Sequence, residues 1–258
     1  MIKITHNAGF FSCCSVKLDS IVNFVNHNNK LPFVDSSYQF RKYKKKLNED
    51  ITYDFFKHYD DIENIKINKN IKYNHKHQFN KYSNLDYYSI SPLIEKYFST
   101  SNKINEIVDY FIEKYDLVYD NTLVVYYRGT DKSKETEIAS FDEFYKQIIN
   151  IISFNDNLKI LVQTDTAQFI DYLNDKELKN ITISENKTSY NNKGIHNENN
   201  GESNYNQMLN FLSTVIIMSK CKYIICGSCN CSMWIMLYRK SSKNVIQYLN
   251  KVWYNYIG

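Results

Sequence analysis

Three short polar segments, each placed directly after an apolar run, carry the side chains of this chain that are best suited to bind an anion. The first is Arg128-Gly129-Thr130-Asp131-Lys132. Arg128 can donate two hydrogen bonds to a phosphate, Lys132 adds a compact positive charge, and Asp131 can orient the arginine. Gly129 permits close approach of the backbone to a ligand. A surface salt bridge is the alternative interpretation of these residues.

The other two segments are residues 163–165 and 227–232, Gln-Thr-Asp and Gly-Ser-Cys-Asn-Cys-Ser. Asp165 could bind a ribose hydroxyl or a base donor, or it could cap the helix expected from residue 166. The turn around Ser228 precedes another expected helix, whose free backbone N–H groups could hold a pyrophosphate. Helix capping by Ser228 or Asn230 is the alternative there.

Apolar periodicity indicates the elements that must position these segments. Short apolar runs alternate with amphipathic helical stretches, a pattern typical of a parallel sheet covered on both faces. Ligands of such folds bind at the carboxyl ends of the strands, where the three polar segments lie. The expected strands are residues 2–4, 31–35, 122–127, 158–163, 180–184 and 223–226, and the expected helices 16–25, 103–115, 141–152, 166–173, 206–220 and 231–239.

Residues 36–90 are less regular and rich in Tyr, Lys, Asn and Asp. The polar stretch 68–81 predicts a long surface loop or an insertion. The basic run 41–46 could touch phosphate, but a solvated face is the favoured interpretation.

Composition narrows the class of protein. The chain has 258 residues, 43% of them apolar, which is enough for one large core or two smaller lobes. Its formal charge of +4 is too small to indicate nucleic-acid binding. No apolar run reaches the roughly 18 residues of a membrane span, and the first residues lack a signal-peptide pattern. We therefore expect a cytoplasmic protein without a nucleic-acid partner or a transmembrane segment.

Six cysteines and an H-x-H pair raise the alternative of a metal site. The spacing of Cys221, Cys226, Cys229 and Cys231 matches no paired CxxC ribbon, so small buried residues and loop thiols are favoured. His75 and His77 lie in the polar stretch without a nearby third ligand. Neither GxGxxG nor GxxxxGK[ST] occurs, which disfavours a standard dinucleotide site or a P-loop kinase.

The motifs resemble those of the fucosyltransferase superfamily, especially its α-1,6- and protein O-fucosyltransferase branches. Residues 126–132, Tyr-Tyr-Arg-Gly-Thr-Asp-Lys, resemble the first signature, H-x-R-x-x-D-K. Residues 160–165 resemble the second, and residues 209–237 the third, with a helix, a strand and a serine-containing turn. A weaker match covers the glycine-containing loop 7–11. Tyr126 stands where the family usually has histidine.

The resemblance implies an α/β fold of the GT-B type, with two Rossmann-like lobes whose parallel sheets face each other across a cleft. Residues 1–115 would form the N-terminal, acceptor-side lobe with an irregular insertion. Residues 116–258 would form the C-terminal lobe that binds the nucleotide sugar. The implied reaction is a metal-independent, inverting transfer of a sugar, fucose from GDP-fucose in these branches, to a hydroxyl of a glycan or protein. No cofactor besides the nucleotide-sugar substrate is implied.

Roles carried over from the family fall on the same three segments. Arg128 would contact the donor diphosphate, Asp165 the nucleoside, and two serines the phosphates. Lys132 would add positive charge at the leaving diphosphate. The remaining donor-binding residues implied by the resemblance are Gly9, Phe10, His196, Ser228 and Ser232.

The base that deprotonates the acceptor hydroxyl is expected to be Glu137 or Glu135, with Asp131 as a further candidate. Two other functions stay open at this point. A SAM-dependent methyltransferase also uses a Rossmann-type sheet, but it predicts a glycine-rich first turn that residues 127–130 do not provide. A non-catalytic glycan- or nucleotide-binding module would keep the lobe without turnover.

Overall fold

The structure is a computed structural model that describes residues 1–63, 65–130, 132, 136–191 and 201–258. Its strands are β1 Ile2–Lys3, β2 Val34–Asp35, β3 Thr122–Tyr127, β4 Lys159–Thr164, β5 Tyr223–Gly227, β6 Val245–Leu249 and β7 Val252–Asn255. Its α-helices are α1 Phe10–Asn28, α2 Thr52–Phe55, α3 Tyr87–Phe98, α4 Asn102–Lys114, α5 Phe141–Ile152, α6 Ala167–Asp175, α7 Gly201–Lys220 and α8 Asn230–Arg239.

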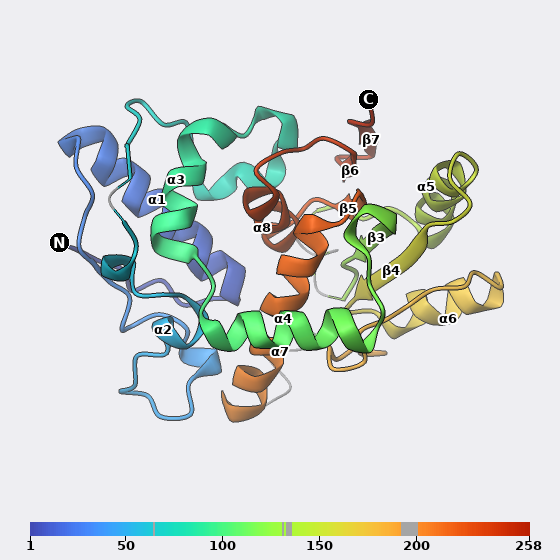
Figure 1. The fold of residues 1–258 in the computed structure, drawn as a ribbon, viewed down its shortest axis with the longest axis horizontal. Helices are drawn as coiled ribbons and strands as arrows, with labels where there is room; N and C mark the ends of the chain where they lie inside the picture. Colours follow the sequence, from blue (N-terminus) through green and yellow to red (C-terminus); the bar gives the residue numbers. More distant parts are fainter. Residues whose placement is uncertain (64, 131, 133–135, 192–200) are drawn as a thin grey trace.

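Two parallel sheets organise the chain. The larger sheet has the order β4-β3-β5-β6-β7, in which only the β6–β7 pair is antiparallel. The smaller sheet consists of β1 and β2, which pair in parallel and are connected by α1. Figure 1 shows α1 and α3 beside one another on one side of the molecule, the large sheet on the other, and α4, α7 and α8 between them. The predicted α/β class with parallel sheets is confirmed.

The large sheet is covered on both faces, which explains why β3 is apolar along its whole length. Val124 and Tyr126 belong to the core that also contains α1, α3, α7 and α8. Leu123, Val125 and Tyr127 face the opposite way, into a second core with α5 and α6. The first core is continuous across residue 116, so the predicted boundary between two lobes stays a prediction.

Several expected elements differ from those observed. Helix α3 was not expected, and it contains Pro92, which removes one backbone hydrogen bond from the helix. Asp86 begins that helix by accepting a 3.2 Å hydrogen bond from the Ser89 N–H. Strands β6 and β7 were also not expected. Conversely, the strand expected at 180–184 is a single bridge between Ile181 and Leu161.

The segment 36–90 is more ordered than its composition indicated. It forms α2 and four short 3-10 helices, η1 Arg41–Tyr43, η2 Tyr59–Asp61, η3 His75–Phe79 and η4 Tyr82–Asn84. Within the stretch expected to be a surface loop, Ile71 and Tyr73 are buried. The Asn26 amide on α1 pairs with both backbone groups of Ile71, at 2.9 and 3.0 Å. This stretch is therefore attached to the core.

Candidate functional site

A cavity of about 550 Å³ opens between the two sheets. One wall is the loop that begins α1, residues 8–12, and the other is formed by the residues that follow β3, β4 and β5. Helix α7, η1, Gln78 of η3 and residues 186–187 also contribute to the lining. Of the donor-binding residues predicted from the sequence, five line this cavity, namely Gly9, Phe10, Arg128, Lys132 and Asp165.

Arg128 and Asp165 meet because β3 and β4 are adjacent parallel strands that end at the same level, with Tyr127 opposite Thr164. Arg128 Nε lies 3.2 Å from Asp165 Oδ2. The same carboxylate accepts a 2.9 Å hydrogen bond from the Gly129 N–H and a 2.7 Å one from the Thr130 hydroxyl. Asp165 therefore binds the loop that carries Arg128.

Gly129 is required by packing rather than by its backbone angles. A Cβ atom at this position would lie 2.5 Å from Thr166 Oγ1 and 2.7 Å from Tyr127 Cε1. The absence of a side chain therefore lets the loops after β3 and β4 pack together. This contact with protein, rather than with a ligand, explains the glycine.

The cavity is lined by more positive than negative side chains. Four cationic residues, Lys42, Arg128, Lys132 and Lys187, face a single described carboxylate, that of Asp165. Lys132 is buried, with its Nζ 3.2 Å from Gln78 Oε1 and 5.2 Å from the centre of the Phe79 ring. Arg128 is half-buried, whereas Lys42 and Lys187 are exposed. An excess of cations at a cavity favours an anionic ligand.

Helix α1 begins at the cavity wall. Gly9 is its N-cap and has an extended backbone. The Phe10 N–H donates a 2.8 Å hydrogen bond to the hydroxyl of Tyr43 in η1. The Phe10 ring packs among Phe40, Tyr43 and Phe55, so both its ring and its backbone N–H contact protein. Burial raises the pKa of Tyr43, which keeps the hydroxyl protonated.

Helix α8 begins on the opposite wall. Cys229, its N-cap, and the next two residues, Asn230 and Cys231, line the cavity. Among the described residues no acceptor is found for the backbone N–H groups of Asn230 and Cys231. Because these N–H groups carry the positive end of the helix dipole, they are suited to an anion.

Ser228 and Ser232, the two serines expected to bind phosphate, do not line this cavity. The Ser228 hydroxyl donates to the Tyr248 carbonyl at 2.8 Å and accepts from the Gln247 amide at 2.8 Å. Ser232 is fully buried, and its hydroxyl bonds with the Gly227 carbonyl at 2.7 Å and with the Tyr82 hydroxyl at 2.5 Å. The turn therefore reaches the cavity through Cys229, Asn230 and Cys231, not through its serines.

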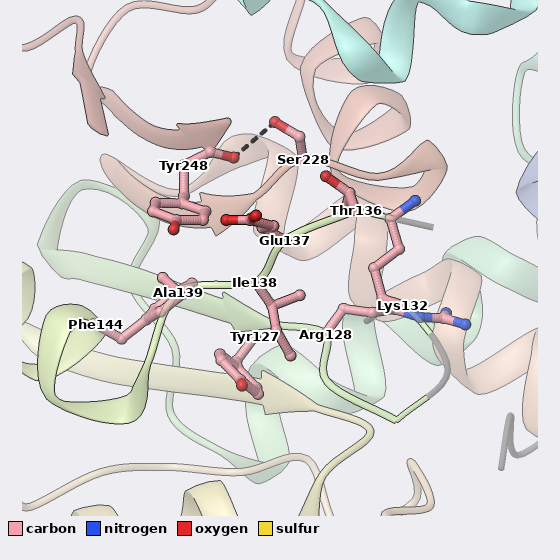
Figure 2. A pocket seen from close by; sticks show the side chains of 11 residues that line it. Tyr127, Arg128, Lys132, Thr136, Glu137, Ile138, Ala139, Phe144, Ser228 and Tyr248 are labelled. Atoms are coloured by element: carbon pink, nitrogen blue, oxygen red, sulfur yellow. Dashed lines mark hydrogen bonds between the residues drawn. The ribbon is translucent and has the colours of Figure 1, made fainter. Parts of the chain in front are cut away.

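Glu137, one of the expected bases, lies outside the main cavity. Its side chain is 58% exposed and forms a 3.0 Å ion pair with Lys251. It lines a separate space of about 10 Å³, roughly the size needed for one water molecule. Figure 2 shows its carboxylate beside Tyr248, whereas the ends of Arg128 and Lys132 point the other way. The other expected bases, Asp131 and Glu135, and His196 lie outside the described residues.

The alternative metal ligands do not converge. All six cysteines are buried, as favoured from the sequence, and burial raises the pKa of several, including Cys226 and Cys231. His75 Nδ1 lies 2.7 Å from Asp19 Oδ2, while His77 Nδ1 is 3.0 Å from the Asn74 N–H. Across the part of the chain that the structure describes, no three potential ligands come together to hold a metal ion.

Sequence reasoning missed the contribution of residues 36–90 to this site. Lys42 and Tyr43, from the basic run interpreted as a solvated face, line the cavity, and so does Gln78. Asn186 and Phe211 line it as well. These residues come from segments distant along the chain, so the sequence does not indicate that they meet. The one signal in the sequence was the position of Lys42 in a basic run.

None of the described helices is long and apolar enough to cross a membrane. The two sheets and the helices packed on them have a fucosyltransferase-like fold. The fucosyltransferase NodZ from Bradyrhizobium has this fold, with a TM-score of 0.56 at 10% identity over 95% of this chain and 94% of that one.

Two further NodZ α-1,6-fucosyltransferase structures resemble the chain less. One was co-crystallised with GDP (TM-score 0.44, 11% identity, 65% of this chain and 52% of that one). The other was soaked with GDP-fucose (TM-score 0.43, 12% identity, 66% and 53%). In these two comparisons the chain spans about half the length of the other protein. No family model matches the sequence, and no curated protein is significantly similar to it.

Proposed function

We propose that this chain is a glycosyltransferase that binds a nucleotide sugar in the cavity between its two sheets. The observation that carries the proposal is the convergence of Arg128, Lys132 and the N-termini of α1 and α8 on one cavity. Guanidinium, ammonium and free backbone N–H groups are the donors that bind a diphosphate. The fold shared with a fucosyltransferase and the three sequence motifs support GDP-fucose as the donor.

In the proposed reaction the leaving diphosphate gains negative charge as the sugar departs. Arg128, Lys132 and the start of α8 stabilise that charge from the wall formed by the residues that follow β3 and β5. These groups do the work that a divalent cation performs elsewhere, which supports metal independence. The one described carboxylate at the cavity, Asp165, is bonded to the Arg128 loop and makes a poor metal ligand.

An acceptor hydroxyl, of a glycan or a protein, would attack the anomeric carbon opposite the diphosphate and invert its configuration. Its base is proposed among Asp131 and Glu135, which follow Arg128 closely in sequence. Glu137 is disfavoured by its ion pair with Lys251 outside the cavity.

A non-catalytic nucleotide-binding module is the second candidate. It is favoured by one observation, that Asp165, the described carboxylate at the cavity, is already occupied by hydrogen bonds. The methyltransferase alternative is disfavoured, because the sulfonium cofactor would meet a cationic wall.

One experiment separates these functions. The chain is incubated with GDP-fucose, UDP-galactose or SAM, and the released nucleotide or S-adenosylhomocysteine is detected. Release of GDP, accelerated by an acceptor glycan, supports the proposal. Binding of GDP, with no release of GDP from GDP-fucose in the presence of any acceptor, supports the non-catalytic module. Release of S-adenosylhomocysteine overturns both the glycosyltransferase and the module.

A further inference from the structure

The carboxylate of Asp165 is surrounded by donors from the neighbouring loop. It accepts hydrogen bonds from the Gly129 N–H at 2.9 Å, the Thr130 N–H at 3.5 Å, the Thr130 hydroxyl at 2.7 Å and the Thr166 hydroxyl at 3.0 Å. Arg128 Nε lies 3.2 Å from the same carboxylate and forms an ion pair with it. An ionised carboxylate has about four lone-pair sites. The hydrogen bonds fill them, although the residue lines the cavity.

An independent feature links the same two loops. The contact between Gly129 and Thr166 has no room for a Cβ atom, which would lie 2.5 Å from Thr166 Oγ1. Gly129 and Thr166, from the loops after β3 and β4, therefore fit closely together. Asp165 lies at their junction, and its side chain is only 12% exposed.

We infer that Asp165 is a positioning residue that holds Arg128 toward a bound diphosphate, and that it does not contact the nucleoside. This inference rests on the proposed diphosphate site. A guanidinium that is ion-paired at its Nε with a fixed carboxylate is restricted in its position before the ligand arrives. Binding then costs less side-chain entropy than it would for a mobile arginine.

The substitution Asp165→Asn tests this with little change in volume. The amide retains one acceptor oxygen but places an NH₂ group against donors of the Arg128 loop. We expect the variant to fold and Arg128 to lose its orientation. The matched control is Asp116→Asn, which removes the partner of Lys159 near the opposite end of β3, where the Asp116 side chain is 88% exposed.

The probes are inorganic pyrophosphate, GDP and guanosine, titrated by calorimetry into the wild type, Asp165→Asn, Arg128→Ala and the double variant. We expect Asp165→Asn to weaken pyrophosphate and GDP binding by about tenfold, the size of one lost charge-assisted interaction, and to leave guanosine binding unchanged. In the Arg128→Ala background the same change is expected to weaken GDP binding by less than about twofold, since residues that act through one another are not additive.

Two outcomes overturn the inference. Weaker guanosine binding with unchanged pyrophosphate binding would show that Asp165 contacts the nucleoside. Equal losses with and without Arg128 would show that the two residues act separately. If Asp165→Asn fails to fold, Thr130→Val removes one of the same hydrogen bonds and is expected to give a smaller loss confined to pyrophosphate and GDP. Failure of the proposed function is distinct, because the wild type itself would then bind neither GDP nor pyrophosphate.

Discussion

The Tyr43 hydroxyl accepts a 2.8 Å hydrogen bond from the backbone N–H of Phe10, the first residue of α1. This bond joins η1 to the loop that forms one wall of the cavity. A segment whose sequence indicates no clear function therefore fixes one of the two helix N-termini at the proposed diphosphate site.

Replacement of Tyr43 by Phe leaves the Phe10 N–H without this acceptor. We expect the free energy of unfolding to fall by about 1 kcal/mol or more, because a buried donor loses its partner. Urea unfolding followed by circular dichroism measures the change. Tyr88→Phe, at a tyrosine that is 81% exposed, is the control and should leave stability unchanged. Equal stability of both variants would show that the Tyr43 bond contributes nothing.

Gly129→Ala introduces a Cβ atom 2.5 Å from Thr166 Oγ1. We expect a loss of about 1–3 kcal/mol of stability, typical of overpacking, and weaker GDP binding because the Arg128 loop must shift. Thermal unfolding and calorimetry measure both. Gly227→Ala is the control for stability, since its Cβ would meet no atom within 4 Å. A Gly129→Ala protein as stable as Gly227→Ala would contradict the packing account.

Glu137→Gln removes the ion pair with Lys251 at the exposed rim. Exposed pairs contribute about 0–1 kcal/mol, and this one lies outside the cavity. We expect the kcat for GDP release to stay within about threefold of the wild type. A loss of a hundredfold or more, together with unchanged GDP affinity, would restore Glu137 as the base.

Lys17 gives a pH dependence of stability that is separate from the site. Burial lowers its pKa from 10.5 to about 8, partly offset by Cys14 and Asp50, and its Nζ lies 5.3 Å from the centre of the Phe98 ring. The unfolded chain therefore binds more protons between pH 8 and 10.5, so this lysine makes stability rise with pH across that interval.

Lys17→Met should abolish that rise. Below pH 8 we expect the variant to be more stable than the wild type, by on the order of 3 kcal/mol before the lost cation–π contact is deducted. The difference in unfolding free energy between the two proteins, measured from pH 7 to 10.5, isolates Lys17 from other titrating groups. A constant difference across this range would disprove the depressed pKa.

The sequence predicted the parts of the fold that depend on local periodicity. Strand β3, helix α5 and the placement of Arg128 after a strand could be predicted because neighbouring residues determine them. The sequence could not predict that the hydroxyls of Ser228 and Ser232 are hydrogen-bonded within the protein, because their partners Tyr248 and Tyr82 are distant in sequence. For the same reason the sequence could not predict the hydrogen bond between Tyr43 and Phe10. Nor could it predict the role of Gly129, which depends on Thr166 in another loop.

The central claim is that a nucleoside diphosphate binds in the cavity through Arg128. Calorimetric titration of GDP into the wild type and Arg128→Ala tests it most directly. We predict saturable binding by the wild type and affinity at least about tenfold lower for the folded variant, since hydrogen bonds to charged groups contribute roughly 1.5–3 kcal/mol. Equal affinity of both proteins, or no binding of GDP by the wild type, would contradict the account.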